Sequence, residues 1–257
     1  MGIAGAALAT AVGPVFSVCI LLPHFLRKRG SLYFTKPEIR LRDIRAILTL
    51  GFPSFIMEFT IGIVTFVYNS AIVKHGYGEI GLAAYLVIGY LMLIVLTLFL
   101  GMAEGLQPVF SHFAGTDETE RSQALRRFSV KLFLALGAVC YLLIVLFSRS
   151  FYGIFSPEDP ALIAFAAEKS IPYFCGFFLA GYNILMISCW QSAQRTKSAL
   201  AVSLSRSLIW PAILTALLPP LFGREVVWLC HSLSEALTAC TVWALLLAQQ
   251  RRSTPAP

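Results

Sequence analysis

Apolar residues form seven long runs along the chain, and charged residues gather between these runs. A helix needs about 20 apolar residues to cross a hydrocarbon core of ~30 Å. Six of the seven runs are long enough. The sixth run along the chain, 208–222, is short, and we expect its helix to begin earlier and to include residues from 199–204. The pattern predicts an all-α, polytopic membrane bundle of about seven transmembrane helices. The runs cover residues 3–26, 47–73, 81–111, 132–148, 171–191, 208–222 and 226–248.

Composition agrees with a membrane protein and excludes several other classes. Hydrophobic residues make up 58% of the chain and charged residues only 13%, against roughly 25% charged in soluble domains. The net charge of +7 lies in the segments between runs, while the aromatic residues lie inside the runs. Nucleic-acid binding needs basic and stacking residues together, so we expect no nucleic-acid partner. The lipid bilayer is the expected partner.

The distribution of Lys and Arg predicts the orientation. With the N-terminus outside, 16 of the 20 basic residues fall in inner loops and four in outer loops. Because basic loops stay in the cytoplasm, we expect a multi-pass protein of the cell inner (plasma) membrane with a cytoplasmic C-terminus. The four outer residues are Lys74, Arg149, Lys169 and Arg224.

Three polar segments connect the runs. Residues 27–45 have isoleucines at helical spacing among charges, which favours an amphipathic connector on the membrane surface; a solvated linker is the alternative. Residues 117–127 place acids before bases, which indicates a short cytoplasmic helix. At the next outer turn, Ser156 is the expected helix cap, ahead of Pro160.

Glu58 is the leading candidate for ion coupling, because an ionisable residue inside a membrane span is costly and is a functional hypothesis by default. Gly62, Thr65 and Asn69 follow it on one helical face, so we expect Thr65 and Asn69 to line a substrate cavity. Burial would raise the carboxyl pKa, which favours exchange of H⁺, or of Na⁺ if other oxygens are close. The alternative is a glutamate that only bonds a neighbouring helix.

Glu104 and Glu235 are the other two ionisable candidates within the runs. Glu104 lies near the cytoplasmic end of the third run, so it either faces the cavity or reaches the headgroups. Gln107 is a further cavity candidate, although with Pro108 it fits a bend better than a ligand. Glu235 is one turn after His231, so the two are expected to pair, either for function or for structure alone.

Tyr182 and Asn183 in the fifth run are the remaining substrate-cavity candidates. Aromatic and amide side chains on one face suit a cavity for flat organic cations. Ordinary helix packing explains them equally well. No catalytic constellation, metal-ligand cluster or GxxxxGK[ST] phosphate loop is present in the sequence, so we expect neither an enzyme nor a bound cofactor, and energy from an H⁺ or Na⁺ gradient.

Several short stretches, in order, resemble the multidrug and toxic compound extrusion (MATE) family of transporters. GAALAT at 5–10 is similar to the start of the family's sixth helix, and GFP at 51–53 to the opening of the seventh. GMAEGLQPVFSHFAG at 101–115 is similar to the end of the eighth. The region 191–206 resembles the link into the eleventh helix, and LLPPLFG at 217–223 the turn into the twelfth.

The resemblance implies an antiporter that expels organic cations in exchange for H⁺ or Na⁺, built from two six-helix lobes. Residues 1–26 would be the sixth helix, 27–46 a basic cytoplasmic linker, 47–250 the C-terminal six-helix lobe and 251–257 a cytoplasmic tail. The chain would then be a fragment, a truncated product without transport activity, or half of a split pair that needs an N-terminal lobe. A lipid-linked precursor flippase of the same superfamily is a further alternative, which would need a cavity rich in Arg and Lys.

The resemblance also implies a partial cation site. Family members with such a site in this lobe place a Glu on the seventh helix, within about one turn of Glu58. They place an Asp on the tenth, where this chain has Ala180 or Gly181.

Overall fold

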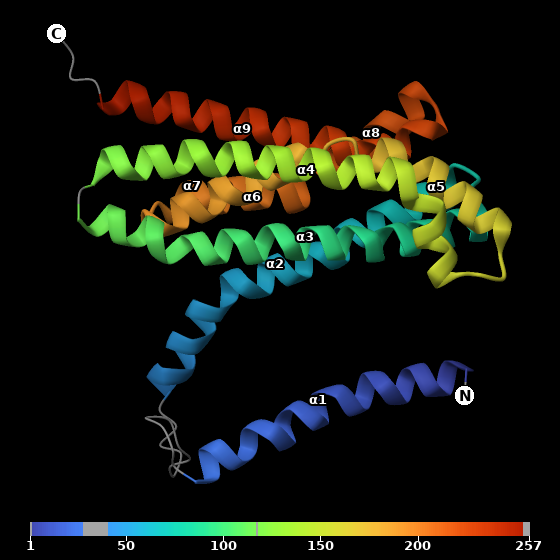
Figure 1. The fold of residues 1–257 in the computed structure, drawn as a ribbon, viewed down its shortest axis with the longest axis horizontal. Helices are drawn as coiled ribbons and strands as arrows, with labels where there is room; N and C mark the ends of the chain where they lie inside the picture. Colours follow the sequence, from blue (N-terminus) through green and yellow to red (C-terminus); the bar gives the residue numbers. More distant parts are fainter. Residues whose placement is uncertain (1, 28–40, 117, 254–257) are drawn as a thin grey trace. The chain divides into compact units, whose positions relative to one another are not determined.

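The computed structural model describes residues 2–27, 41–116 and 118–253, and this part of the chain consists of helices and the turns between them. It divides into two compact units, Met1–Pro53 and Ser54–Pro257, and each is considered by itself. Figure 1 shows the course of the chain. The all-α class predicted from the sequence is confirmed.

The first unit contains α1 (Gly2–Leu26) and the beginning of α2 (Leu41–Lys74). Pro14 and Pro23 lie inside α1, as membrane helices tolerate when other groups satisfy the freed backbone. Residues 28–40 lie outside the described part, so the prediction of an amphipathic connector is tested only at its end, where 41–45 already belong to α2.

The second unit contains the end of α2 and all later elements. Figure 1 shows α3, α4, α6 and α9 lying lengthwise beside one another. After α2 the elements are α3 (Gly78–Gly115), α4 (Thr119–Phe155), α5 (Pro160–Phe174), α6 (Phe177–Ser192), α7 (Thr196–Leu204), the π-helical turn η1 (Ser205–Ile209), α8 (Trp210–Phe222), the 3₁₀ turn η2 (Arg224–Leu229) and α9 (Cys230–Ser253).

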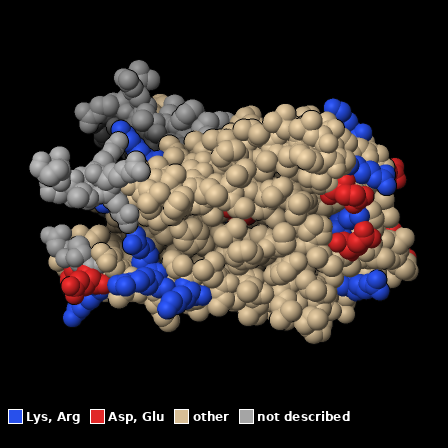
Figure 2. Space-filling model, turned by 90° about the horizontal axis from the view of Figure 1, so that it is seen from above, with Lys and Arg blue, Asp and Glu red and all other residues tan. Residues whose placement is uncertain are grey.

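Within the described residues, four helices are long and apolar enough to cross a membrane: Gly78–Gly115, Glu120–Phe155, Thr196–Phe222 and Arg224–Gln249. The pair α5 and α6, bent by 50°, makes a fifth span if the two are counted together. Ala11–Ile20 and Phe59–Lys74 are shorter apolar helices. Figure 2 shows a broad band with very little charge on its surface, between two ends where charged side chains gather, as expected for a bundle within a bilayer.

Two local predictions need correction. The segment predicted as a separate cytoplasmic helix is instead the first part of α4, which runs without a break from Thr119 to Phe155. Asp159, not Ser156, caps α5: its carboxylate accepts a hydrogen bond from the N–H of Leu162 at 2.9 Å. An Asp directly before Pro160 satisfies a free N–H of the first turn better than a serine three residues earlier.

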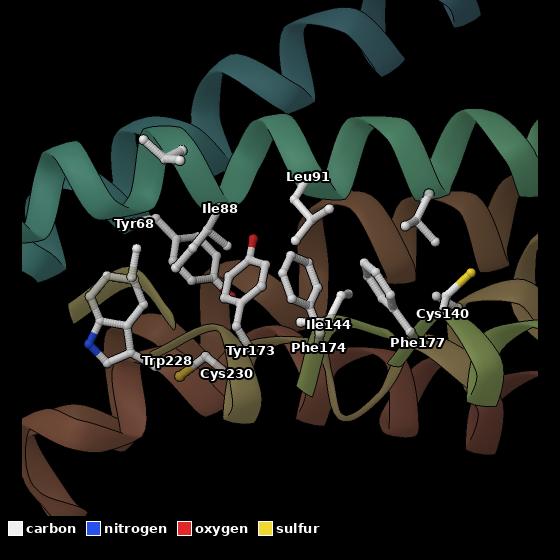
Figure 3. Packing of buried hydrophobic residues seen from close by; sticks show 14 of the residues in the cluster. Tyr68, Ile88, Leu91, Cys140, Ile144, Tyr173, Phe174, Phe177, Trp228 and Cys230 are labelled. Carbon is white, nitrogen blue, oxygen red and sulfur yellow. The ribbon is translucent and has the colours of Figure 1, made fainter. Parts of the chain in front are cut away.

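Helix α3 shows how apolar periodicity builds the core. Its buried side chains recur every three or four residues, so they form one face, while Leu86 and Leu93 on other faces are exposed. The buried face meets aromatic residues of α5 and α6, and Figure 3 shows this packing. The buried residues of α3 include Ala84, Ile88, Leu91, Val95, Phe99 and Ala103.

The α5–α6 span is broken at Cys175 and Gly176, and α9 repairs the break. The hydroxyl oxygen of Ser232 accepts a hydrogen bond from the N–H of Gly176 at 2.9 Å. The same hydroxyl lies 2.8 Å from the carbonyl oxygen of Tyr173. Inside a bilayer, freed backbone groups need a protein partner, and this side chain supplies one. A Cβ on Gly176 would lie 2.8 Å from the Cα of Ser232, so only glycine allows this approach.

Candidate functional site

A cavity of about 280 Å³ lies between α3, α6 and the α7–η1 segment. We call it the Glu104 cavity. Both polar residues that the sequence placed at the end of the third run, Glu104 and Gln107, line it. Apolar side chains cover part of the wall, so the cavity combines an apolar surface with a few polar groups, as small-molecule sites do. Its wall consists of Leu100, Ala103, Glu104, Gln107, Ile184, Ile187, Ser188, Gln191, Ser203, Arg206 and Ser207.

One wall of the Glu104 cavity is formed by an arginine that is bonded to a fully buried glutamate. The Nη2 atom of Arg206 lies 2.8 Å from Oε1 of Glu235, and its Nε atom donates to Oε2 at 3.1 Å. The Glu235 side chain is 1% exposed and that of Arg206 18%. The ion pair and the hydrogen bond between guanidinium and carboxylate offset part of the cost of burying the two charges.

Asn183 completes this cluster from α6. Its Nδ2 atom donates to the carboxylate Oε2 of Glu235 at 2.8 Å and to the Glu235 backbone carbonyl at 2.9 Å. The carboxylate therefore connects three segments, α6, η1 and α9. Asn183 and Glu235, predicted separately as cavity and coupling residues, are thus brought together.

The π-helical turn η1 holds Arg206 at this position. Pro211 follows shortly after, at the start of α8. Proline has no N–H, and in a regular α-helix its ring would clash with the carbonyl of Ser207, four residues earlier. A π-helical turn at Ser205–Ile209 widens the helix there. Such turns occur often at functional sites.

Arg206 was not predicted as a site residue, because its charge places it in a predicted cytoplasmic loop. The structure places it well inside the span Thr196–Phe222. A signal was available, since the 15-residue run 208–222 was too short and had to extend backwards past Arg206. The hydrogen bonds of the Glu235 carboxylate go to Arg206 and Asn183, and the His231 ring stacks on Tyr173 with centroids 4.6 Å apart. Among the described residues, the carboxylate thus has its hydrogen-bond partners on other segments and not one turn earlier on α9.

The other predicted site residues lie elsewhere. Thr65 is exposed and Asn69 half-buried on α2, and neither lines the Glu104 cavity. Tyr182 packs against a separate apolar cluster around Met186. The side chain of Glu58 lies outside the described residues, although its backbone belongs to α2. Roles for these four residues in ion coupling or substrate binding therefore stay predictions.

The charge of the Glu104 cavity favours a positively charged ligand. Arg206 is neutralised by Glu235, whereas Glu104 forms no ion pair with any residue in the described ranges. A carboxylate beside a half-apolar wall attracts cations and holds their apolar parts. The site therefore has the chemistry expected for an amphiphilic cation.

Helices that cross a membrane, a broken span and a polar cavity between helices define the chain as a polytopic membrane protein of the transporter type. The sequence profile of the MatE family matches residues 53–217. This chain belongs to the MatE family, and it is a transporter-family protein, not an enzyme. The resemblance noted in the sequence is thereby confirmed.

Relatives and solved structures agree with this assignment. The multidrug export protein MepA of Staphylococcus saprophyticus is 25% identical over 96% of this chain and 54% of its own length. MepA of Staphylococcus haemolyticus is 23% identical over 98% and 55%. An inward-facing multidrug resistance MATE transporter of the MOP superfamily superposes with a TM-score of 0.80 at 19% identity, covering 100% of this chain and 60% of its own.

An outward-facing structure of a MATE transporter of the same superfamily has a TM-score of 0.73 at 18% identity, over 99% and 58% of the two chains. These similarities to solved structures establish the fold. The chain spans about half the length of the curated relatives that it matches.

Proposed function

We propose that this chain forms the C-terminal lobe of a multidrug efflux antiporter that exports organic cations in exchange for H⁺ or Na⁺. The observation that carries the proposal is the Glu104 cavity. In it the carboxylate of Glu104, which has no ion pair among the described residues, stands beside a neutralised Arg206 and an apolar wall. Two relatives that match along almost the whole chain are multidrug export proteins. The protein acts in the plasma membrane, together with an N-terminal lobe that supplies the other wall.

Coupling requires a carboxylate that binds the ion in one state and releases it in another. Glu58 remains the leading candidate, and the structure adds reasons to consider Glu104 and Glu235. Glu104 is accessible from the cavity, so a cation and a proton compete for it directly. Glu235 is held by Arg206 and Asn183, so protonating it would free Arg206 within the cavity wall.

A lipid-linked precursor flippase fits the cavity less well. An anionic substrate needs unpaired cationic groups, but Arg206 is bonded to Glu235 and Glu104 is part of the same wall. A product without transport activity remains the other alternative, and efflux measurements decide between it and the antiporter.

The experiment is ethidium efflux from an efflux-deficient bacterial strain that expresses the complete reading frame encoding this chain. We expect efflux that stops when a protonophore collapses the H⁺ gradient, or that requires external Na⁺. Glu104→Gln should lower the efflux rate about tenfold, because a charged hydrogen-bond partner contributes about 1.5–3 kcal/mol, and Glu58→Gln should abolish the ion dependence.

Glu79→Gln is the matched control. Glu79 lies on the same helix as Glu104, is exposed, and does not line the cavity. Its substitution should leave efflux unchanged. If the complete protein reaches the membrane and exports no cation, the antiporter function is wrong. Equal effects of the Glu79 and Glu104 substitutions would remove Glu104 from the substrate site.

A further inference from the structure

A second cavity of about 280 Å³ opens at the end of the bundle where α3 ends and α4 begins. We call it the Arg126 pocket. Its wall comes from four helices and the α6–α7 turn, and it shares no residue with the Glu104 cavity. The wall residues that matter here are Phe110, Phe113, Gln123, Arg126, Trp190 and Arg195.

The two guanidinium groups of the Arg126 pocket differ in their bonding. Arg195 donates to the side-chain oxygen of Gln249 at 2.6 Å, which fixes it against α9. Arg126 is only partly exposed and forms no ion pair or hydrogen bond with a residue in the described ranges. Its neighbour Arg127 is exposed and donates to a backbone carbonyl instead. The N–H donors of Arg126 are therefore available to a ligand that enters the pocket.

The charges and the aromatic wall of the pocket fit the level of the lipid headgroups. Arg126 and Arg195 lie in its wall, Phe113 there is half-buried, and basic and aromatic side chains are enriched where membrane and water meet. Further along α4, Phe128 and Leu142 are 64% and 56% exposed, as expected for a surface in contact with acyl chains. The pocket therefore lies where α4 enters the bilayer.

We propose that the Arg126 pocket binds the phosphodiester headgroup of an anionic phospholipid. The guanidinium groups of Arg126 and Arg195 would bind phosphate oxygens, a geometry for which arginine is well suited. The apolar wall would hold the glycerol and the first carbons of the acyl chains. Basic pockets between membrane helices bind anionic headgroups in this way.

The test measures the phospholipid that stays bound to the complete protein after extraction from bilayers of equal parts phosphatidylglycerol and phosphatidylcholine. Native mass spectrometry counts the bound lipids. The wild type should retain phosphatidylglycerol in preference. Arg126→Ala should lower this retention about fivefold, since a basic residue near an anionic lipid contributes about that factor, and Arg126→Lys should lower it less.

Arg127→Ala is the matched control, because it removes the same charge from the adjacent position outside the pocket. It should leave retention unchanged. Equal losses for Arg126→Ala and Arg127→Ala would show a non-specific attraction and overturn the proposal. Release of the lipid by excess inorganic phosphate would show a site for a free anion and would also overturn it. Lipid retention is independent of ethidium efflux, so failure of one proposal leaves the other standing.

Discussion

Glu235 is the residue on which the centre of the bundle depends most. Its carboxylate bonds both a guanidinium and an amide from two other segments. The sequence identified Glu235 and Asn183 as polar residues inside membrane runs, because composition alone marks them. Their partner Arg206 could not be predicted in the same way. Its charge marks it as a loop residue, and residue spacing within one helix does not show which helices face each other.

Replacing Glu235 alone should destabilise the protein strongly. Glu235→Gln leaves the partly buried Arg206 without its counter-charge, and breaking a buried pair costs about 3–5 kcal/mol. The double variant Glu235→Gln with Arg206→Gln should recover part of this loss. Thermal unfolding in detergent, analysed as a double-mutant cycle, measures the coupling. Additive effects of the two substitutions would show that the pair contributes no joint stabilisation.

At the scale of elements, the irregular helices could be predicted only in part. The sixth span was expected to extend backwards, and it does, but its π-helical turn was not foreseen. Proline and glycine in the sequence indicate where the backbone hydrogen bonds of a helix are interrupted. The side chain that satisfies the freed backbone groups comes from a distant segment, which local sequence does not indicate. The break at Gly176 shows this, because Ser232 lies 56 residues further along the chain.

Removing the Ser232 hydroxyl should weaken the broken span. Ser232→Ala leaves the N–H of Gly176 without its acceptor in a buried position, which costs about 1–3 kcal/mol. The midpoint of thermal unfolding should fall accordingly. Ser150→Ala, on an exposed position of α4, serves as the control and should unfold like the wild type. An unchanged midpoint for Ser232→Ala would mean that another group, such as water, satisfies the break.

The contact between α4 and α6 depends on Gly137. A Cβ there would lie 2.4 Å from the Cα of Phe178, a distance that forces the backbones apart. Gly137→Ala should therefore destabilise the protein by about 1–3 kcal/mol, the usual cost of overpacking. Gly89→Ala, where nothing lies within 4 Å, should be neutral or slightly stabilising. Retention of ethidium efflux and melting temperature by Gly137→Ala would refute the close contact.

For the whole molecule, the sequence predicted the class and most of the spans, because a helix that crosses the hydrocarbon core must be a long apolar run. It also predicted orientation from loop charges, an expectation that shifts only slightly now that Arg206 lies inside a helix. Which helices pack together within residues 54–257 does not follow from periodicity, since hydropathy describes each helix and not its partner.

The orientation leads to a direct prediction. A fluorescent protein that matures only in the cytoplasm, fused after residue 257, should be bright, and alkaline phosphatase at the same position should be inactive. The physical reason is the excess of Lys and Arg in the inner loops. Fusions in the outer turn near Gly76 should give the opposite pair of results. The reverse pattern would overturn the predicted orientation.

Helix α6 has a consequence for communication across the molecule, because it forms a partition between the two cavities. Ile184, Ser188 and Gln191 face the Glu104 cavity, while Met186, Cys189 and Trp190 face the Arg126 pocket. A rotation of this single helix would enlarge one cavity at the expense of the other. Ligands bound in the two cavities would then influence each other's affinity by the same factor, as reciprocity of coupled binding requires.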